Sequence, residues 1–372
     1  MTAAHHEDDL LRYVRPDLLR MAGYEPIEPV EVLAERLGVP PERIVKLDGN
    51  ENLYGPSPKA LAVLHGAIDY NIYPDPDQRP VRAALATYTG VAAEHIVAGS
   101  GSDELIDLVG RALLTPGDRV IDLVPTFGMY AFTTDVCGGV YTPVRRAPDF
   151  SVDLAAVEAA VDDRTKLIFV ASPNNPSGNL LPREDLARLL ALGPPVVVDE
   201  AYVEFSGGSV VGLVPERANL IVLRTFSKWA GLAGLRAGYG VLPRPLADLL
   251  MVIKQPYSLN VAAEAAVLAS LEDRDVLFRR VDAIVGERER MAARLSAIPF
   301  LRPWPSSANF VLCDVTRGDA RLLRDGLRRR GIFTRYFGRE GLSDKIRISV
   351  GLPQHTDILV AALEEMGDEP RD

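Results

Sequence analysis

The most informative segment of the chain is TFSKWAGLAGLR, residues 225–236. It follows an apolar run, Leu220 to Leu223, that predicts a buried strand. Lys228 stands among Ser, Thr and Gly next to apolar residues, whereas a solvated lysine normally has charged neighbours. Such a lysine can form a Schiff base with a carbonyl compound, and desolvation would lower its pKa. Taken alone, the same pattern also fits a lysine in a surface loop.

Three further segments carry chemistry that suits such a lysine. VVVDEAY, residues 196–202, puts Asp199 at the end of a buried strand, where a charge is costly unless a cation such as a protonated pyridine nitrogen pairs with it. SPNNPSG, residues 172–178, offers an amide side chain after another strand. GSGSDE, residues 99–104, opens a helix whose free N–H groups and dipole suit a phosphate. The segments together predict a ligand site.

The alternation of elements predicts the fold class. Between about residues 95 and 240, short β-branched runs alternate with amphipathic stretches, a pattern typical of an α/β domain with a mostly parallel sheet. Ligand sites in such sheets form at the C-terminal ends of the strands. The expected strands are Arg119–Val124, Lys166–Ala171, Pro195–Asp199, Leu220–Leu223 and Ala237–Val241.

A chain of 372 residues is long enough for two domains. We expect residues 1–45 to form an N-terminal arm or part of a small domain, residues 46–260 a large domain, and residues 261–372 a smaller α+β C-terminal lobe. In that lobe we expect a long helical stretch over Val261–Ile298. Strands Asn309–Val315, Ile332–Tyr336 and Lys345–Val350 and helices Ala320–Arg330 and Thr356–Met366 should follow.

Composition excludes several classes of protein. Apolar residues make up 47% and charged residues 25%, which is typical of a soluble globular chain and excludes wholesale disorder. The net charge of −10 argues against nucleic acid or an acidic membrane as the main partner. Two distant cysteines and five scattered histidines predict neither disulfides nor a metal site. The chain also shows no membrane span and an acidic start, so we expect a cytoplasmic protein.

In this order and spacing, SPNNPSG, DEAYVEF and TFSKWAGLAGLR resemble the pyridoxal-phosphate (PLP) dependent aminotransferases of classes I and II, which share the fold of aspartate aminotransferase. Within that group the chain resembles the histidinol-phosphate aminotransferases, over nearly its whole length from Tyr24 to Gly351. The resemblance implies PLP-dependent transferase fold type I, with a mostly parallel central sheet flanked by helices in the large domain, and PLP as cofactor.

The resemblance also implies a role for each residue around the cofactor ring. Lys228 would hold the cofactor covalently and later move a proton between substrate and cofactor. Asp199 would keep the pyridine nitrogen protonated, so that the ring can accept electrons. Tyr202 and Asn175 would donate hydrogen bonds to the phenolic oxygen of the ring. Phe127 matches an aromatic residue, often tyrosine in relatives, that stacks on the ring face.

For the cofactor phosphate, the resemblance implies a cradle of backbone N–H groups, hydroxyls and one guanidinium. Tyr73 matches a tyrosine that reaches this phosphate from the other subunit, so a homodimer with composite active sites is expected. By itself, Tyr73 also fits an ordinary aromatic residue in a turn before a proline. The residues expected in the cradle are Ser102, Asp103, Thr225, Ser227 and Arg236.

Four residues are expected to bind substrate by the same resemblance. Arg347 matches the arginine that forks onto the α-carboxylate in the wider family. Arg335 and Tyr24 match residues that hold the substrate phosphate, although an arginine after a strand is also a common solvated charge. Asn52 could contact substrate.

One motif departs from the family. LDGNEN, residues 47–52, stands where the family has L-N-x-N-E-N, so Asp48 replaces an asparagine. The two asparagines that remain in this motif, Asn50 and Asn52, can equally be turn-formers. The departure puts the identity of the substrate in doubt and leaves cofactor binding unaffected.

The function implied is transamination between L-histidinol phosphate and 2-oxoglutarate, giving imidazole-acetol phosphate and L-glutamate, in histidine biosynthesis. An aromatic amino acid aminotransferase would share every cofactor residue, and a PLP decarboxylase of a phosphorylated amino acid has the same fold, so both stay open. A non-catalytic PLP-fold module, such as a transcription regulator, is disfavoured because the N-terminal arm is too short and too acidic for a DNA-binding domain.

Overall fold

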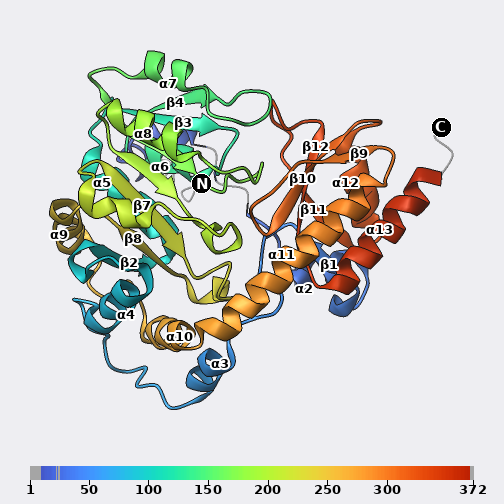
Figure 1. Ribbon diagram of the computed structural model, residues 1–372, viewed down its shortest axis with the longest axis horizontal. Helices are drawn as coiled ribbons and strands as arrows, with labels where there is room; N and C mark the ends of the chain where they lie inside the picture. Colours follow the sequence, from blue (N-terminus) through green and yellow to red (C-terminus); the bar gives the residue numbers. More distant parts are fainter. Residues whose placement is uncertain (1–9, 22, 24–25, 369–372) are drawn as a thin grey trace, which may run out of the picture.

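The structure is a computed structural model in which residues 10–21, 23 and 26–368 are described. Two sheets organise the chain into a large unit and a small lobe, and the long helix α11 (Arg274–Ser296) runs from one toward the other (Figure 1). None of the helices in the described part is both long and apolar enough to cross a membrane.

The large unit is built on a seven-stranded sheet with the order β2-β8-β7-β6-β5-β3-β4. Strand β8 runs antiparallel to both of its neighbours, and the other neighbouring pairs run parallel. The sheet is therefore mostly parallel, as expected. Its strands are β2 (Ile96–Ser100), β3 (Arg119–Val124), β4 (Val140–Arg145), β5 (Thr165–Ala171), β6 (Val196–Asp199), β7 (Leu220–Thr225) and β8 (Ala237–Val241).

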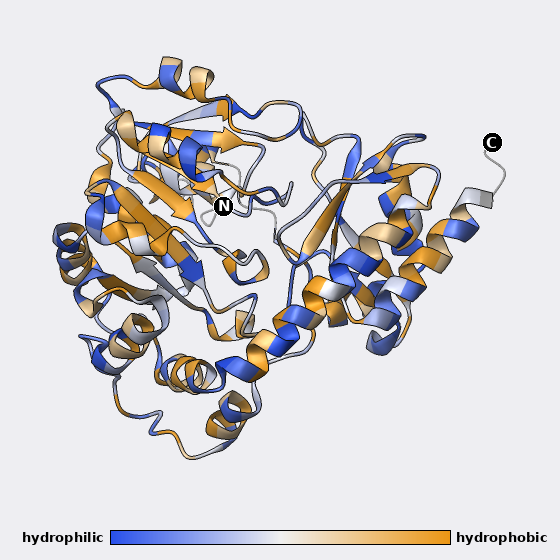
Figure 2. Ribbon diagram, in the orientation of Figure 1, coloured by the Kyte–Doolittle hydropathy of each residue, from blue (hydrophilic) through white to orange (hydrophobic). Residues whose placement is uncertain are grey.

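Both faces of this sheet are buried, which explains why its strands are almost continuously apolar. Along β5, Leu167 and Phe169 join one apolar cluster, whereas Ile168 and Val170 join the other. The hydropathy colouring shows apolar strands between helices that are apolar on one side only (Figure 2). One face is covered by α5 (Gly101–Leu113), α6 (Met129–Val136) and α9 (Arg244–Ile253), and the other by α4 (Arg79–Thr89), α7 (Leu154–Ala160), α8 (Arg183–Ala191) and α10 (Val261–Glu272).

The small lobe has a five-stranded sheet with the order β1-β11-β12-β10-β9. Strand β1 (Val45–Leu47) comes from the N-terminal part of the chain and pairs in parallel with β11. The helix α2 (Val30–Leu37) packs nearby, because Leu33 and Ala34 share an apolar cluster with Phe333. The other elements are β9 (Leu301–Pro303), β10 (Phe310–Val315), β11 (Ile332–Tyr336), β12 (Lys345–Ser349), α12 (Ala320–Arg329) and α13 (Pro353–Asp368).

The long helical stretch expected over Val261–Ile298 is wrong in one respect, because it is broken at Asp273 into α10 and α11. Asp273 leaves the helical conformation at φ −101° and ψ 20°, and its carboxylate accepts a hydrogen bond from the Lys59 N–H at the start of α3 (Pro58–His65). The break lets α10 pack on α3 while α11 heads for the small lobe (Figure 1). The domain limits at residues 45 and 260 stay a prediction.

Candidate active site

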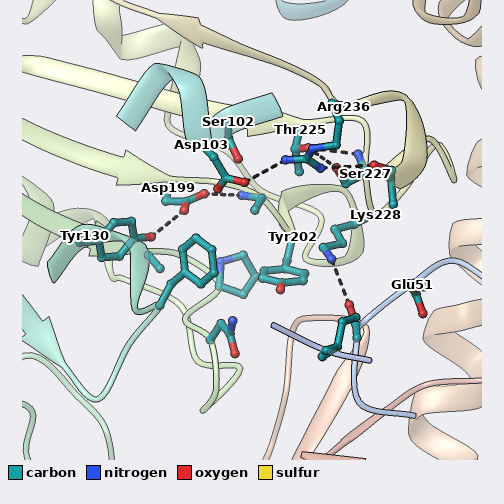
Figure 3. A pocket seen from close by; sticks show the side chains of 18 residues that line it. Glu51, Ser102, Asp103, Tyr130, Asp199, Tyr202, Thr225, Ser227, Lys228 and Arg236 are labelled. Atoms are coloured by element: carbon teal, nitrogen blue, oxygen red, sulfur yellow. Dashed lines mark hydrogen bonds and ion pairs between the residues drawn. The ribbon is translucent and has the colours of Figure 1, made fainter. Parts of the chain in front are cut away.

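A cavity of about 250 Å³ opens where β5, β6 and β7 end and α5 begins (Figure 3). This is the edge at which parallel strands deliver their following loops to one place. Most of the residues expected around the cofactor line it, together with Ile27, Glu51 and Tyr130. The expected residues are Ser102, Asp103, Phe127, Asn175, Asp199, Tyr202, Thr225, Ser227, Lys228 and Arg236.

Asp199 is the last residue of β6 and is only 4% exposed. One carboxylate oxygen accepts a hydrogen bond of 2.6 Å from the Tyr130 hydroxyl, and the other accepts one of 3.0 Å from the Ala201 N–H. Burial raises the pKa of Asp199 to about 6, and the hydrogen bond from Tyr130 opposes this rise. A carboxylate in this position favours a cationic partner in the cavity.

Lys228 follows β7 and projects into the same cavity (Figure 3). Its Nζ donates a hydrogen bond of 3.1 Å to the carbonyl oxygen of Gly49. Burial lowers the pKa of Lys228 to about 8, and the positive charge of Arg347 acts in the same direction. The amine is therefore uncharged more often near neutral pH than that of an ordinary lysine, and the uncharged amine is the form that attacks a carbonyl.

The start of α5 forms an anion cradle with the end of β7. Helix N-termini present free N–H groups and a positive dipole end. Gly101 has φ +81°, and a Cβ atom there would lie 2.6 Å from the Arg236 guanidinium, so only glycine lets this arginine approach the helix. Arg236 also donates to the Asp103 carboxylate at 2.8 Å. The guanidinium thus lies directly over the first turn of α5.

Two hydroxyls complete this cradle. The Thr225 hydroxyl donates to the Ser227 hydroxyl oxygen at 2.9 Å, and the Ser227 N–H donates to Thr225 at 3.1 Å. Both side chains are buried, and both line the cavity. Hydroxyls, N–H groups and a guanidinium are the donors that bind a phosphate dianion.

A second cavity, of about 430 Å³, borders the first and shares Lys228 and Phe127 with it. It extends to the small lobe, where three guanidinium groups line it: Arg335 at the end of β11, Arg339 in the following loop, and Arg347 on β12.

Arg347 is buried and lines the second cavity. It donates to the Asn175 side-chain oxygen at 2.6 Å and to the Asp48 carbonyl at 2.5 Å. Its guanidinium lies over the Phe310 ring, 5.2 Å from the centroid. The contact with Asn175 joins a small-lobe strand to a loop of the large sheet.

Tyr202 projects its hydroxyl toward Asn50, whose amide donates to it at 3.0 Å. Asn50 is held in turn by Ser349, which accepts from its N–H and donates to its side-chain oxygen. Its own φ of 53° lies in the left-handed region that asparagine tolerates. Asn50 thus connects the N-terminal segment to Tyr202 in the site.

The comparisons with known proteins agree with this geometry. The family described as Aminotransferase class I and II matches residues 42–363. The chain belongs to the class I and II aminotransferases. It is 53% identical over 362 residues to a histidinol-phosphate aminotransferase of Roseiflexus castenholzii, covering 95% of this chain and 98% of the relative. A chloroplastic enzyme of that name from Nicotiana tabacum is 48% identical over 95% of this chain and 86% of its own.

A solved structure also matches. The histidinol-phosphate aminotransferase of Sinorhizobium meliloti, in complex with pyridoxal-5'-phosphate, superposes with a TM-score of 0.86 at 30% identity, over 95% of this chain and 97% of that one. The fold is that of the PLP-dependent transferases of type I, as the resemblance implied.

The residues of this aminotransferase site fit the cofactor implied by the resemblance. The buried carboxylate of Asp199 suits a protonated ring nitrogen, and the amine of Lys228 suits an aldehyde. The cradle at the start of α5 suits a phosphate, with Arg236 placed over Gly101. Phe127 offers an aromatic face beside the cavity. In the described part of the chain, no group of three or more His, Cys, Asp or Glu could hold a metal.

Three residues of the expected site do not line these cavities or cannot be placed, and one of them, Tyr73, is expected to act in the other subunit. Asn52 is buried and lines neither cavity: its amide donates to the Trp229 carbonyl and its side-chain oxygen accepts from the Tyr54 N–H. Tyr73 is 76% exposed and stacks on Tyr257, with 4.3 Å between ring centroids. Tyr24 lies outside the described residues.

The sequence reading gave no role to three residues that line the site. Tyr130 contacts Asp199, Asn50 contacts Tyr202, and Arg339 lines the second cavity. Tyr130 had a usable signal, because it lies one helical turn after Phe127 in PTFGMY, residues 125–130. Asn50 lies in the LDGNEN motif but was interpreted only as a turn-former, and Arg339 carried no such signal, since it does not lie near a strand end of the large sheet.

Proposed function

We propose that this protein is a PLP-dependent aminotransferase that converts L-histidinol phosphate and 2-oxoglutarate into imidazole-acetol phosphate and L-glutamate, a step of histidine biosynthesis. Relatives that carry the name histidinol-phosphate aminotransferase, at 48–53% identity over nearly the full chain, support this choice of reaction.

The observation that carries the proposal is the position of Lys228 between two cavities of different chemistry. One cavity offers a phosphate cradle, a buried carboxylate and an aromatic face, which suits the cofactor. The other offers three guanidinium groups, which suit the anionic ends of a phosphorylated amine and of a dicarboxylic oxo acid. A single amine can therefore reach both partners of the reaction.

When bound, PLP supplies an aldehyde that takes up the amino group and a protonated ring that accepts the electron pair left by removal of the α-proton. Asp199 holds the proton on the ring nitrogen, and Tyr130 and the Ala201 N–H orient that carboxylate. Lys228 Nζ would take the proton from the substrate α-carbon and deliver it to the aldehyde carbon of the cofactor, and would move a proton in the opposite direction when the oxo acid reacts. Its lowered pKa of about 8 lets it act as base and acid near neutral pH.

The other residues of the chain bind and orient. Thr225, Ser227, Arg236 and the N–H groups of Ser102 and Asp103 hold a phosphate, while Asn175 and Tyr202 lie beside the ring site. Arg335 and Arg347 receive the anionic groups of the two substrates in turn, since both line the cavity that contains Lys228.

We include a homodimer with composite sites and a cytoplasmic location in the proposal. Tyr73 lines neither cavity of its own chain, yet it is exposed and stacked on Tyr257 beside further exposed apolar side chains, Tyr70 and Ile72. An exposed patch of this kind is typical of an interface. Tyr73→Phe should weaken PLP binding without changing substrate preference, and light scattering should give twice the chain mass.

The decisive experiment adds L-histidinol phosphate, L-phenylalanine and L-glutamate separately to the PLP-loaded protein and follows loss of its visible absorbance band. We expect L-histidinol phosphate to react with a higher kcat/KM than L-phenylalanine, and L-glutamate to react as well. A faster reaction with L-phenylalanine would make the protein an aromatic amino acid aminotransferase. Release of carbon dioxide from a phosphorylated amino acid, without formation of an oxo product, would make it a decarboxylase.

A further inference from the structure

Three guanidinium groups surround one phenyl ring in the second cavity. The guanidinium carbons of Arg335, Arg339 and Arg347 lie 5.8, 5.3 and 5.7 Å from the centroid of Phe337. All three arginines line the cavity, and so does Phe337. The negative face of an aromatic ring attracts cations at such distances. Phe337 therefore gathers three positive charges that would otherwise repel one another.

Phe337 is itself held by apolar packing. It packs against an apolar cluster of the small lobe that contains Phe150, Leu312 and Leu342. The ring thus contacts both the apolar cluster and the guanidinium groups. Because the ring packs on this cluster, it fixes the positions of the three guanidinium groups relative to the small lobe.

The charge balance of the cavity is strongly positive among the described residues. Its cationic lining consists of Lys228, Arg236, Arg335, Arg339 and Arg347, and its anionic lining consists of Asp48 and Asp103. Asp48 lies 3.0 Å from the Lys46 amine, and Asp103 pairs with Arg236. The chain as a whole carries a net charge of −10, so this local excess attracts anions into one place.

Arg339 is the arginine of this group to which the sequence assigned no role. It is exposed at the rim of the cavity, in the loop between β11 and β12. Its Nη2 donates a hydrogen bond of 2.8 Å to the Thr126 carbonyl, next to Phe127 in the large unit. The side chain therefore bridges the small lobe and the loop that carries Phe127.

We propose that Arg339 is a substrate-binding residue for the phosphate monoester of the amino donor, and that Phe337 is a positioning residue that holds the three guanidinium groups around that phosphate. The proposal rests on the proposed function and deepens it, because it assigns the dianionic end of the donor to a cluster of three arginines. A rival interpretation is that Arg339 only ties the two lobes together through Thr126.

The test compares Arg339→Gln with the unchanged enzyme, both loaded with PLP, using L-histidinol phosphate and L-histidinol as donors. These donors differ only in the phosphate. We expect kcat/KM for L-histidinol phosphate to fall about 10-fold, as for one charge-assisted hydrogen bond at an exposed rim, and kcat/KM for L-histidinol to change less than about 2-fold. Inorganic phosphate should also inhibit the variant more weakly than the unchanged enzyme.

Arg328→Gln is the matched control, because its guanidinium lies 5.7 Å over Phe333 in the same lobe and does not line either cavity. It should leave both donors unchanged. Equal losses for both donors in Arg339→Gln would support the lobe-tie interpretation and overturn the proposal, as would no loss at all. If the unchanged enzyme itself does not prefer L-histidinol phosphate to L-histidinol, the proposed function fails instead.

Phe337 is tested by its effect on KM. Phe337→Leu keeps an apolar side chain against the cluster but removes the ring, so KM for L-histidinol phosphate should rise about 5-fold while kcat stays within about 2-fold. Phe337→Tyr keeps the ring and should restore KM. If Phe337→Leu raises KM equally for L-histidinol, or Phe337→Tyr does not restore it, Phe337 has only a packing role.

Discussion

At the cofactor end of the site, the polar side chains come from loops that follow neighbouring strands of one sheet, whereas at the substrate end they come from parts of the chain that are far apart. Asp199 and Thr225 end the adjacent strands β6 and β7. By contrast, the second cavity draws on Asp48 near the N-terminus, Thr126 after β3, and Arg347 near the C-terminus.

This difference predicts that the two ends of the site respond differently to substitution. A sheet buried on both faces holds its strand ends firmly, so the cofactor end depends mainly on the large unit, with Gly49 and Asn50 of the N-terminal segment contacting Lys228 and Tyr202. The substrate end depends on contacts across two units, such as the bond from Arg347 to Asn175. We therefore expect changes at the cofactor end to affect every donor equally, and changes at the substrate end to separate donors or raise KM.

The largest effect is expected from Lys228→Ala, which removes the group shared by both cavities. Turnover should fall by at least about 10⁴-fold with every donor, because no other amine can move the proton. The Tm of the variant without cofactor should not fall, since a desolvated lysine is removed. The measurement combines single-turnover assays with circular dichroism melting, and retained turnover with L-glutamate would contradict the assignment of Lys228.

A smaller effect is expected from Arg347→Gln at the substrate end. The variant loses a buried charge-assisted contact to substrate, worth about 1.5–3 kcal/mol, so kcat/KM should fall about 10- to 100-fold. PLP affinity, measured by titration of the cofactor-free protein, should change little. A matched loss of PLP affinity would mean that the two ends of the site are not separable.

Next comes Gly101→Ala at the cofactor end. A Cβ atom at φ +81° strains the backbone and displaces Arg236, which should weaken PLP binding about 10-fold, as expected for roughly 1–2 kcal/mol of strain. The ratio of kcat/KM between L-histidinol phosphate and L-phenylalanine should stay the same. Gly286→Ala serves as control, because α11 has open space at that position.

A smaller effect is expected from pH, through the protonation of the Lys228 amine. Labelling of the cofactor-free protein at Lys228 by PLP and borohydride should rise with pH and level off above about 8, where the amine is uncharged. Because the pKa of this group is lowered from 10.5, the unfolded chain binds more protons between pH 8 and 10.5, so the contribution of Lys228 to the free energy of unfolding increases with pH in that window. Peptide mapping by mass spectrometry follows the label, and a midpoint near pH 10 would contradict this pKa.

The smallest effect on activity is expected from Asn52→Ala. Its amide holds the Trp229 carbonyl, so the free energy of unfolding should fall by about 1–3 kcal/mol when that buried oxygen loses its partner. With substrate and PLP saturating, kcat should change less than about 3-fold. A large rise in KM with unchanged stability would instead restore Asn52 as a substrate-binding residue.

Sequence reasoning succeeded best where the pattern is local. Strands β3 and β8 were predicted to the residue, because apolar runs bounded by turn residues are distinct in a sheet that is buried on both faces. Strands β1 and β9, of three residues each, were missed, since so short a run has no periodicity to detect. The longer strands β2 and β4 of the large sheet were missed as well. The helix break at Asp273 was missed for a related reason: the contact with Lys59 that accompanies it is remote in sequence.

What the sequence determined by itself is that polar residues from Asp199 to Lys228 stand at strand ends of the large sheet, because each follows a short apolar run that marks a buried strand. Only the tertiary structure decided that Tyr130 contacts Asp199, that Asn50 reaches Tyr202, and that three arginines surround Phe337. Most of these contacts join elements that are far apart along the chain. They depend on how two units pack together, which no local pattern of residues encodes.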